Sequence, residues 1–178
     1  MPTSGGKISL RLAMSLDGFI ADPDGRYDWI EDVPSAELDT DHQVPFEQYL
    51  RDVDVVVMGR RCFDEGGHTD YVQLRLPVIV ATSRPPDTES TGVEFTDDVL
   101  RRVRQERDAG RHCFLFGGGE LVTSFLRVDL VDELTVGIVP VLLGAGRRLF
   151  HETGNRIDLR LADYTVLDGK ARLTFQRR

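Results

Sequence analysis

The 178-residue chain contains few cysteines, few lysines and no long apolar run. Cys62 and Cys113 lie too far apart for a C-x-x-C pair or a zinc motif, and they predict reduced, buried thiols of a cytoplasmic protein. The longest uncharged stretch, Leu134 to Gly146, has 13 residues with three glycines and a proline, so it cannot span a bilayer. The first residues contain no apolar run of signal-peptide length. We therefore expect no membrane segment.

Positive charge is also scarce. Lysine and arginine total 22 against 30 aspartates and glutamates, which gives a net charge of −8. A field of that sign repels nucleic acid and anionic lipid, so neither is expected as a partner, but it leaves room for a local positive pocket that binds a small anion. The four histidines show no metal-ligand spacing, and no metal site is predicted.

The apolar residues suffice for one core and fall into short segments. They make up 40% of the chain, and the charged residues, at 29%, are in the range of globular domains. Apolar and polar residues alternate from Ile8 to Leu12, which predicts a strand. Three nearly continuous apolar runs are typical of buried parallel strands: Val53 to Met58, Leu76 to Ala81, and His112 to Phe116. A further strand is predicted over Val131 to Val139.

Helical patterns and a final turn complete the prediction. Helices are expected over residues 36–51, 96–109 and 120–127. Near the end, Asp168-Gly169 stands between two alternating runs, which is the strongest short-range hairpin signal. We therefore predict a flexible start at residues 1–6 and one α/β domain over residues 7–178. Its central sheet is mostly parallel and flanked by helices, with an antiparallel C-terminal hairpin.

The first candidate for chemistry is a run of three glycines, Gly117, Gly118 and Gly119, between a buried strand and a helix. Glycines let the backbone approach a ligand closely, and free N–H groups of the first helical turn suit a phosphate. The alternative is a plain tight turn, which one or two glycines would satisfy. The dinucleotide fingerprint G-x-G-x-x-G is not met, because its third glycine is Val122.

Two other segments also follow apolar strands. One is Gly59-Arg60-Arg61, and the other is Thr82-Ser83-Arg84. Taken alone, the first segment is weak evidence, because Gly-Arg is a common dipeptide. The second segment alone is better explained as a polar loop. Together with the glycine run they end neighbouring parallel strands, the edge where open α/β sheets bind ligands. Three phosphate-type sites on one edge predict a ligand with several phosphates, such as a 2′-phosphorylated dinucleotide.

In its motifs and their order, the chain resembles the dihydrofolate reductase-like superfamily. It is most similar to the reductase domain of bacterial bifunctional deaminase–reductases of the riboflavin pathway and to their stand-alone relatives. The resemblance extends over nearly the whole chain from Lys7. The motifs that carry it, in order, are residues 13–21 (AMSLDGFIA), 27–30 (YDWI), 57–60 (VMGR), 82–85 (TSRP), 116–119 (FGGG), 140–144 (PVLLG) and 148–150 (RLF).

The resemblance implies NADPH as cofactor and a homodimer as the assembly. It places Ala13 and Ile20 around the nicotinamide, and Ser83 and Arg84 at the adenosine 2′-phosphate. The full set of residues expected to bind the cofactor is Ala13, Ile20, Gly59, Arg60, Arg61, Thr82, Ser83, Arg84, Phe116, Gly117, Gly118, Gly119, Glu120 and Leu121.

Two departures from the family pattern matter. Cys62 stands where the family has threonine, although its backbone N–H can still serve. Dihydrofolate reductases also carry a pterin-binding carboxylate on the helix before the Met-Gly-Arg strand, and here the matching stretch is His42 to Phe46, with Asp41 the nearest acid. The missing carboxylate argues against folate reduction. Pro45 in that stretch suggests that the helix begins there.

The proton donor and the substrate wall have several candidates. Asp17 and Asp28 are the acids to test first, although Asp17 also suits a turn and Asp28 a helix cap. Trp29 suits a stacking wall or the core, and Phe46 and Tyr49 are candidates for the wall that fit the core better. We expect an NADPH-dependent reductase of a small pyrimidine- or pterin-like heterocycle. The alternatives are 5-amino-6-(5-phosphoribosylamino)uracil reductase and a non-catalytic nucleotide-binding protein of the same fold.

Overall fold

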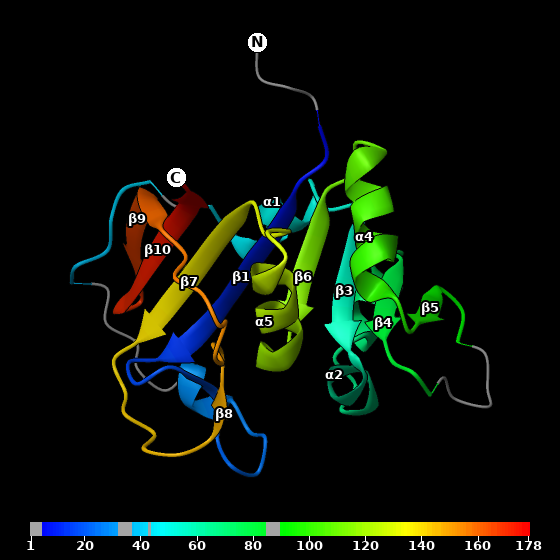
Figure 1. Ribbon diagram of the computed structural model, residues 1–178. Helices are drawn as coiled ribbons and strands as arrows, with labels where there is room; N and C mark the ends of the chain where they lie inside the picture. Colours follow the sequence, from blue (N-terminus) through cyan, green and yellow to red (C-terminus); the bar gives the residue numbers. More distant parts are fainter. Residues whose placement is uncertain (1–4, 32–36, 43, 85–89) are drawn as a thin grey trace.

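A computed structural model describes residues 5–31, 37–42, 44–84 and 90–178 of the chain. They contain an eight-stranded sheet in the order β5-β4-β3-β6-β1-β7-β10-β9 and a small sheet of β2 and β8 (Figure 1). The strands are β1 (Ile8–Ser15), β2 (Phe19–Ala21), β3 (Val55–Gly59), β4 (Val78–Ala81), β5 (Val93–Thr96), β6 (Cys113–Gly117), β7 (Glu133–Val139), β8 (Arg147–Arg148), β9 (Leu159–Leu167) and β10 (Lys170–Arg177).

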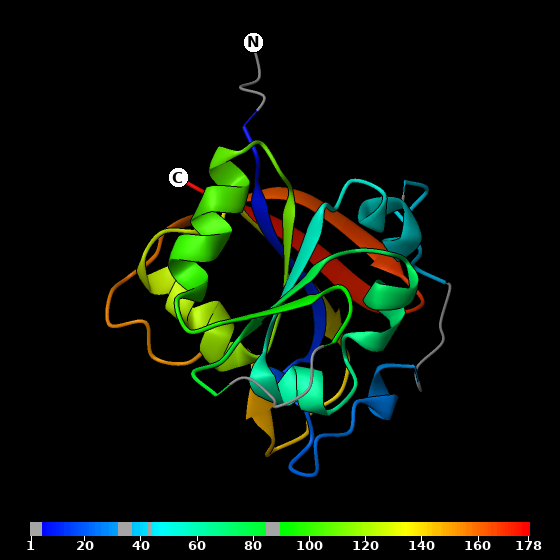
Figure 2. The same cartoon turned by 90° about the vertical axis from the view of Figure 1, so that its right-hand side faces the viewer.

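Helices cover both faces of the large sheet. In Figure 2, α4 and α5 lie on one side of the strands, and α1 and α3 lie on the other. The helices are η1 (Asp28–Ile30, a 3-10 turn), α1 (Phe46–Leu50), α2 (Arg60–Asp64), α3 (Thr69–Gln73), α4 (Val99–Asp108) and α5 (Gly119–Arg127). Among the described residues, none of these helices has the length and apolar character needed to cross a bilayer.

The central strands are apolar on both faces because each face supports its own core. Against α4 and α5, Leu10 and Val57 pack with Phe125 in one buried cluster. On the opposite face, Met58 and Phe114 belong to a second cluster together with residues of α1 and α3. Strands that are buried on both sides read as continuous apolar runs, which explains the three runs in the sequence.

The predicted fold class is confirmed. Strands β5, β4, β3, β6, β1 and β7 pair in parallel, and β10 pairs antiparallel with β7 and β9. The β9–β10 hairpin turns at Asp168 and Gly169, whose φ angles are 50° and 71°. Positive φ at both central positions is what a two-residue hairpin turn requires, which is why Asp-Gly is such a reliable signal there.

The prediction of a helix over residues 36–51 was wrong in its extent, whereas the start expected at Pro45 is confirmed. In the described part of that range, only Phe46–Leu50 is helical, and Pro45 is its N-cap with ψ of 156°. Proline has no N–H to donate, so the helix starts just after it. Residues 36 and 43 lie outside the described residues, as do residues 1–4 of the predicted flexible start. The short elements α2, α3 and β5 were not predicted.

Candidate functional site at the carboxyl edge of the sheet

The three phosphate-type segments meet at one edge of the sheet. The arrowheads of β1, β3, β6 and β7 point to the same lower edge in Figure 1. In the register of neighbouring strands, Met58 pairs with Gly117, and Gly59 pairs with Ala81. The Arg60 guanidinium also donates a hydrogen bond to the carbonyl of Arg84, which joins the segments after β3 and β4. The glycine run after β6 therefore lies beside the first arginine segment.

The glycine run leaves room at this edge. The Gly117–Gly118 peptide is cis, and α5 starts at Gly119 without a side-chain cap. A Cβ on Gly117 would meet no atom within 4 Å, and one on Gly118 would meet Cys62 Sγ and Ile20 Cδ1, both at 3.9 Å. A Cβ on Gly59 would come no closer than 3.7 Å to the carbonyl of Gly117. Extra atoms therefore fit against this backbone, which is the property that a phosphate cradle needs.

Gly119 is different, because the backbone of β8 lies directly against it. A Cβ at this position would stand 2.0 Å from the carbonyl oxygen of Arg148 and 2.7 Å from that of Leu149. The neighbouring Leu149 is fully buried, and β8 pairs with β2 through Phe19. The third glycine of the run is thus required by packing. A Cβ on Gly118 would make only ordinary contacts, and Gly117 has open space beside it but a φ of 118°, which favours glycine.

An ion pair connects β8 to the C-terminal end of α2. Arg147 of β8 donates to Glu65 at 2.8 Å, and this bond lowers the pKa of Glu65. Cys62 of α2 has a raised pKa because its thiol is partly buried. At neutral pH the residue is therefore a neutral thiol, and its placement beside Gly118 makes it part of the wall around the glycine run.

The arginine and hydroxyl segments have exposed side chains. Arg61, Ser83 and Arg84 are exposed, and Thr82 Oγ1 accepts a hydrogen bond from the Arg84 N–H at 3.1 Å. Arg60 also pairs with Asp64 at 2.8 Å. Arg61 and Arg84 are thus exposed to an anionic ligand at this edge, whereas the guanidinium of Arg60 is held by Asp64 and by the Arg84 carbonyl.

Four other predicted cofactor residues differ in whether their side chains are exposed at this edge. Phe116 packs its ring against Tyr71 of α3, at 5.7 Å between centroids, so only its backbone belongs to the loop. Glu120 is exposed in the first turn of α5, and Leu121 is partly buried. Ala13 lies in β1 beside Gly137 of β7.

Asp17 anchors the loop that follows β7. Its carboxylate accepts hydrogen bonds from Ser15 Oγ at 2.6 Å, from the Gly144 N–H at 2.7 Å and from the Leu143 N–H at 3.2 Å. The Ser15 hydroxyl and then these two amides hold the pKa of Asp17 below its usual value. The geometry supports an anchoring carboxylate, and the catalytic role of Asp17 stays a prediction.

This anchor gives a prediction with a pH dependence. Replacing Asp17 with asparagine is expected to lower the melting temperature at pH 7, because the charge that orders residues 143 and 144 is lost. Since the folded pKa is depressed, the stabilisation is present above the aspartate pKa of about 3.9 and disappears as the pH falls below it. Thermal unfolding of both proteins from pH 7 to pH 3 should therefore show a gap that narrows on acidification. Asp97→Asn, at an exposed position, is the control, and a gap of constant size would contradict the anchor.

Asp28 and Trp29 lie at the same lower edge. They belong to η1, where Asp28 is exposed and Trp29 is partly buried, with its indole N–H donating to the carbonyl of Arg26 at 3.3 Å. Their predicted roles, in proton donation and in a stacking wall, are compatible with this position and stay predictions.

Phe46 and Tyr49 lie toward the other end of the sheet. The Tyr49 hydroxyl is 2.6 Å from Ser9 Oγ, near the amino end of β1, and its ring packs on Phe114. Phe46 stacks on Tyr49 at 5.9 Å between centroids and is more exposed. The sequence favoured a core role for both, and the aromatic contacts of Tyr49 agree with it. A substrate contact through Phe46 stays a prediction.

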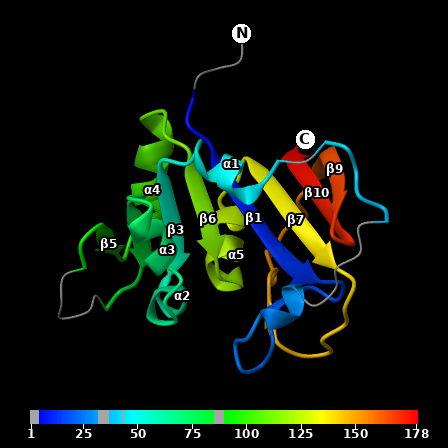
Figure 3. The ribbon, with the colours of Figure 1, turned by 180° about the vertical axis from the view of Figure 1, so that it is seen from behind.

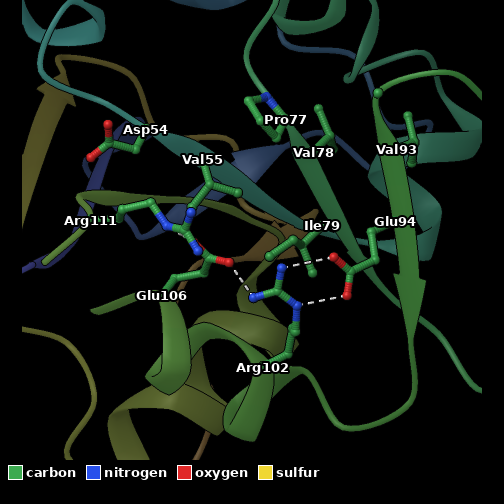
Figure 4. A pocket seen from close by; sticks show the side chains of 11 residues that line it. Asp54, Val55, Pro77, Val78, Ile79, Val93, Glu94, Arg102, Glu106 and Arg111 are labelled. Carbon is green, nitrogen blue, oxygen red and sulfur yellow. Dashed lines mark hydrogen bonds and ion pairs between the residues drawn. The ribbon is translucent and has the colours of Figure 1, made fainter. Parts of the chain in front are cut away.

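A cavity of about 370 Å³ lies on the opposite edge, between α4 and strands β3, β4 and β5 (Figure 4). The carboxylate of Glu106 lies between the guanidinium groups of Arg102 and Arg111, and Arg102 also forms two hydrogen bonds with Glu94 at 2.7 and 2.9 Å. Because these charges pair with one another and lie far from the glycine run, we interpret the group as a structural ion-pair network. In the part of the chain that the structure describes, no cluster of histidine, cysteine and acidic side chains could hold a metal ion.

Comparisons with known proteins agree with this architecture. The family model described as the RibD C-terminal domain matches residues 6–173. The uncharacterized protein YwjB of Bacillus subtilis (strain 168) is 32% identical over 167 residues, which cover 87% of this chain and 88% of YwjB.

Solved structures are also similar. A Shewanella sp. PV-4 protein that is provisionally assigned to riboflavin biosynthesis has a TM-score of 0.78 and 26% identity, and the match covers 97% of this chain and 99% of that one. The Thermotoga maritima diaminohydroxyphosphoribosylaminopyrimidine deaminase/5-amino-6-(5-phosphoribosylamino)uracil reductase has a TM-score of 0.70 and 16% identity. That match covers 98% of this chain and 57% of the Thermotoga chain, and it shows a shared fold.

Proposed function

Because the chain belongs to the RibD C-terminal domain family, we propose that it is an NADPH-dependent reductase of a small pyrimidine- or pterin-like heterocycle. The observation that carries the proposal is the meeting of the three segments after β3, β4 and β6 at one edge. There Arg60 reaches the carbonyl of Arg84, and Gly118 leaves room beside Cys62 and Ile20. An acidic protein thereby gathers fixed positive charge and bare backbone where open sheets bind nucleotides.

In this proposal, NADPH supplies the hydride when it is bound. The chain's own residues bind and orient it: Arg60, Arg61 and Arg84 attract phosphates, and the backbone of Gly117 and Gly118 lets the ligand approach closely. The loop after β1, which Asp17 fastens to residues 143 and 144, positions Ile20 beside the glycine run. The substrate's proton would come from Asp17, from Asp28 or from water.

A binding experiment tests the cofactor. Titration with NADPH, followed by nucleotide fluorescence, should show saturable binding. In Arg84→Ala we expect about tenfold weaker NADPH binding, because one charge-assisted hydrogen bond to the 2′-phosphate is lost. Binding of NADH, which lacks that phosphate, should change by less than about twofold. The matched control is Arg101→Ala, which removes an exposed arginine of α4 that pairs with Asp98.

The outcomes separate the candidate functions. Failure of the unaltered protein to bind NADPH would contradict both the reductase and its non-catalytic alternative. Binding without loss of nicotinamide absorbance, across a panel of pyrimidines and pterins, would favour the non-catalytic nucleotide-binding protein. Oxidation of NADPH with 5-amino-6-(5-phosphoribosylamino)uracil, and with no other member of the panel, would favour the riboflavin-pathway reductase. The match to the Shewanella protein makes this reductase the second candidate.

A further inference from the structure

The face of the sheet that carries α1 and α3 changes character at β1. On β3 and β6 this face is apolar, with Met58 and Phe114 in the buried cluster. On β1, β7 and β10 the same face is polar. Figure 3 shows it, with α1 near its upper end and the glycine-run edge below. Two rows of side chains cross it in the strand register: Arg11, Thr135 and Thr174 form the first, and Ala13, Gly137 and Arg172 form the second.

In the second row, Ala13 and Gly137 have little or no side chain and lie between larger residues. We call these two positions the floor. Ala13 and Gly137 stand side by side, and Gly137 lies inside a central strand, where glycine weakens the strand and often marks close approach of a ligand. A Cβ on Gly137 would come no closer than 3.7 Å to any atom outside its own neighbours. Packing within the chain therefore does not require glycine here. A flat molecule could lie on this bare part of the sheet, next to the Ala13 position that the family resemblance gives to the nicotinamide.

Two arginines flank this floor without a carboxylate partner. The guanidinium groups of Arg11 and Arg172 both donate to the carbonyl of Val44, the latter at 2.9 Å. Arg11 is also held over the ring of Tyr49, 5.0 Å from its centroid. Within the described residues, neither guanidinium forms an ion pair with an acid, whereas those of Arg60, Arg102 and Arg147 do.

The local electrostatics favour an anion beside these two arginines. Partial burial and then the neighbouring Arg172 lower the pKa of Arg11 to about 10, and burial also lowers the pKa of Arg172. Both groups are still charged at neutral pH, so two like charges face each other over one backbone carbonyl. In the same row, the buried hydroxyl of Thr165, opposite Arg172, has no hydrogen-bond partner among the described residues. An anion between the arginines would relieve their repulsion.

We propose that Arg11 and Arg172 bind an oxyanion of the substrate, a carboxylate or a phosphate, while its planar ring lies over Ala13 and Gly137. This inference rests on the proposed reductase function, which brings the cofactor to the same end of β1. Guanidinium groups are donors only, so they select substrates with acceptor groups at this position and disfavour the amino-substituted edge of a pterin. The substrate class is accordingly an acidic heterocycle, rather than a neutral one.

The test uses pairs of probes that differ in one anionic group. Orotate is compared with uracil for a carboxylate, and uridine 5′-monophosphate is compared with uridine for a phosphate. Each is titrated into the protein already saturated with NADPH, so that the probe cannot occupy the cofactor's phosphate sites. We expect one charged member to bind at least about tenfold more tightly than its neutral partner, the range of a charge-assisted bond. Which pair shows the preference identifies the oxyanion.

Variants assign the preference to the arginines. Arg172→Gln and Arg11→Gln should each reduce the affinity ratio by about tenfold and leave NADPH binding unchanged. Arg160→Gln is the control, since Arg160 is an exposed arginine of the same hairpin, bonded to Gln176. Gly137→Val should weaken binding of both members of a pair alike, because it fills the floor.

Two outcomes would overturn this proposal, and each is separable from failure of the reductase itself. Equal affinity for charged and neutral probes in the unaltered protein, with NADPH bound, excludes an anion subsite and leaves the reductase standing. A preference that survives both arginine substitutions places the subsite elsewhere. If a variant does not fold, the affinity ratio of the unaltered protein at low and high salt still decides, because an anion preference must weaken with salt. Failure of the unaltered protein to bind NADPH, in contrast, rejects the proposed function.

Discussion

Gly119→Ala is expected to destabilise the protein by about 3 kcal/mol, which lowers the melting temperature by roughly 10 °C. The added Cβ would meet the carbonyl oxygen of Arg148 at 2.0 Å and that of Leu149 at 2.7 Å. Both are backbone atoms, and Leu149 is fully buried, so neither can move aside as the end of a flexible side chain could. Either α5 or β8 must shift, and the contact between the glycine run and β8 is lost. Thermal and urea unfolding measure the effect.

The neighbouring glycine provides the matched control. Gly118→Ala adds the same methyl group, but its nearest atoms are Cys62 Sγ and Ile20 Cδ1 at 3.9 Å, an ordinary contact. We expect its melting temperature to stay within about 2 °C of the original, while NADPH affinity falls by at least about tenfold, because the methyl group fills the proposed cradle. Equal stability of the two variants would contradict the packing of Gly119. Unchanged NADPH binding by Gly118→Ala would contradict the placement of the cofactor.

Glu106→Gln is expected to lower the free energy of unfolding by about 3 kcal/mol. The carboxylate is 3% exposed and lies between the guanidinium groups of Arg102 and Arg111 (Figure 4). Glutamine keeps the size and removes the charge, so Arg111 loses its partner and Arg102 keeps only Glu94. The effect falls at the lower end of the range of about 3–5 kcal/mol for breaking a buried pair, because both arginines reach solvent. Urea unfolding measures the change.

A surface ion pair on the same helix is the control for this prediction. Arg101 pairs with Asp98 at 2.8 Å, and both side chains are at least half exposed. Arg101→Ala should cost less than about 1 kcal/mol, and the N-cap is preserved, since Asp98 accepts from the backbone N–H of Arg101. A similar loss in both variants would show that burial does not set the strength of the Glu106 pairs.

The sequence was sufficient for most of the large sheet because its signals are local, but it did not show β5. Strands β3, β4 and β6 lie in continuous apolar runs, β1 alternates, and Asp168-Gly169 marks the hairpin by positive φ. The helix over 36–51 was overestimated because the apolar spacing of Val44, Phe46 and Tyr49 extends across Pro45, which the backbone does not follow. The short α2 and α3 were missed because five residues are too few to show a helical period.

The residues of the candidate site were likewise predicted only in part. The glycine and arginine segments could be found because each directly follows a strand, and parallel strands end at one edge. Arg11 and Arg172 could not, because alternation shows only which residues share a face of one strand. That β1 and β10 flank the same strand depends on pairing between distant segments. The Glu65–Arg147 ion pair was hidden for the same reason, since its partners are 82 positions apart.

The strand order also has a consequence for synthesis of the chain. β1 leaves the ribosome before its neighbours β6 and β7, which place Cys113 beside Ile8 and Glu133 beside Ser9. Until those later strands emerge, both long edges of β1 are unpaired, and such edges invite association with other chains. The growing chain is therefore exposed to aggregation between the synthesis of β1 and that of β6 and β7. Its closure is a slow, long-range step, as expected when contacting residues are far apart in sequence.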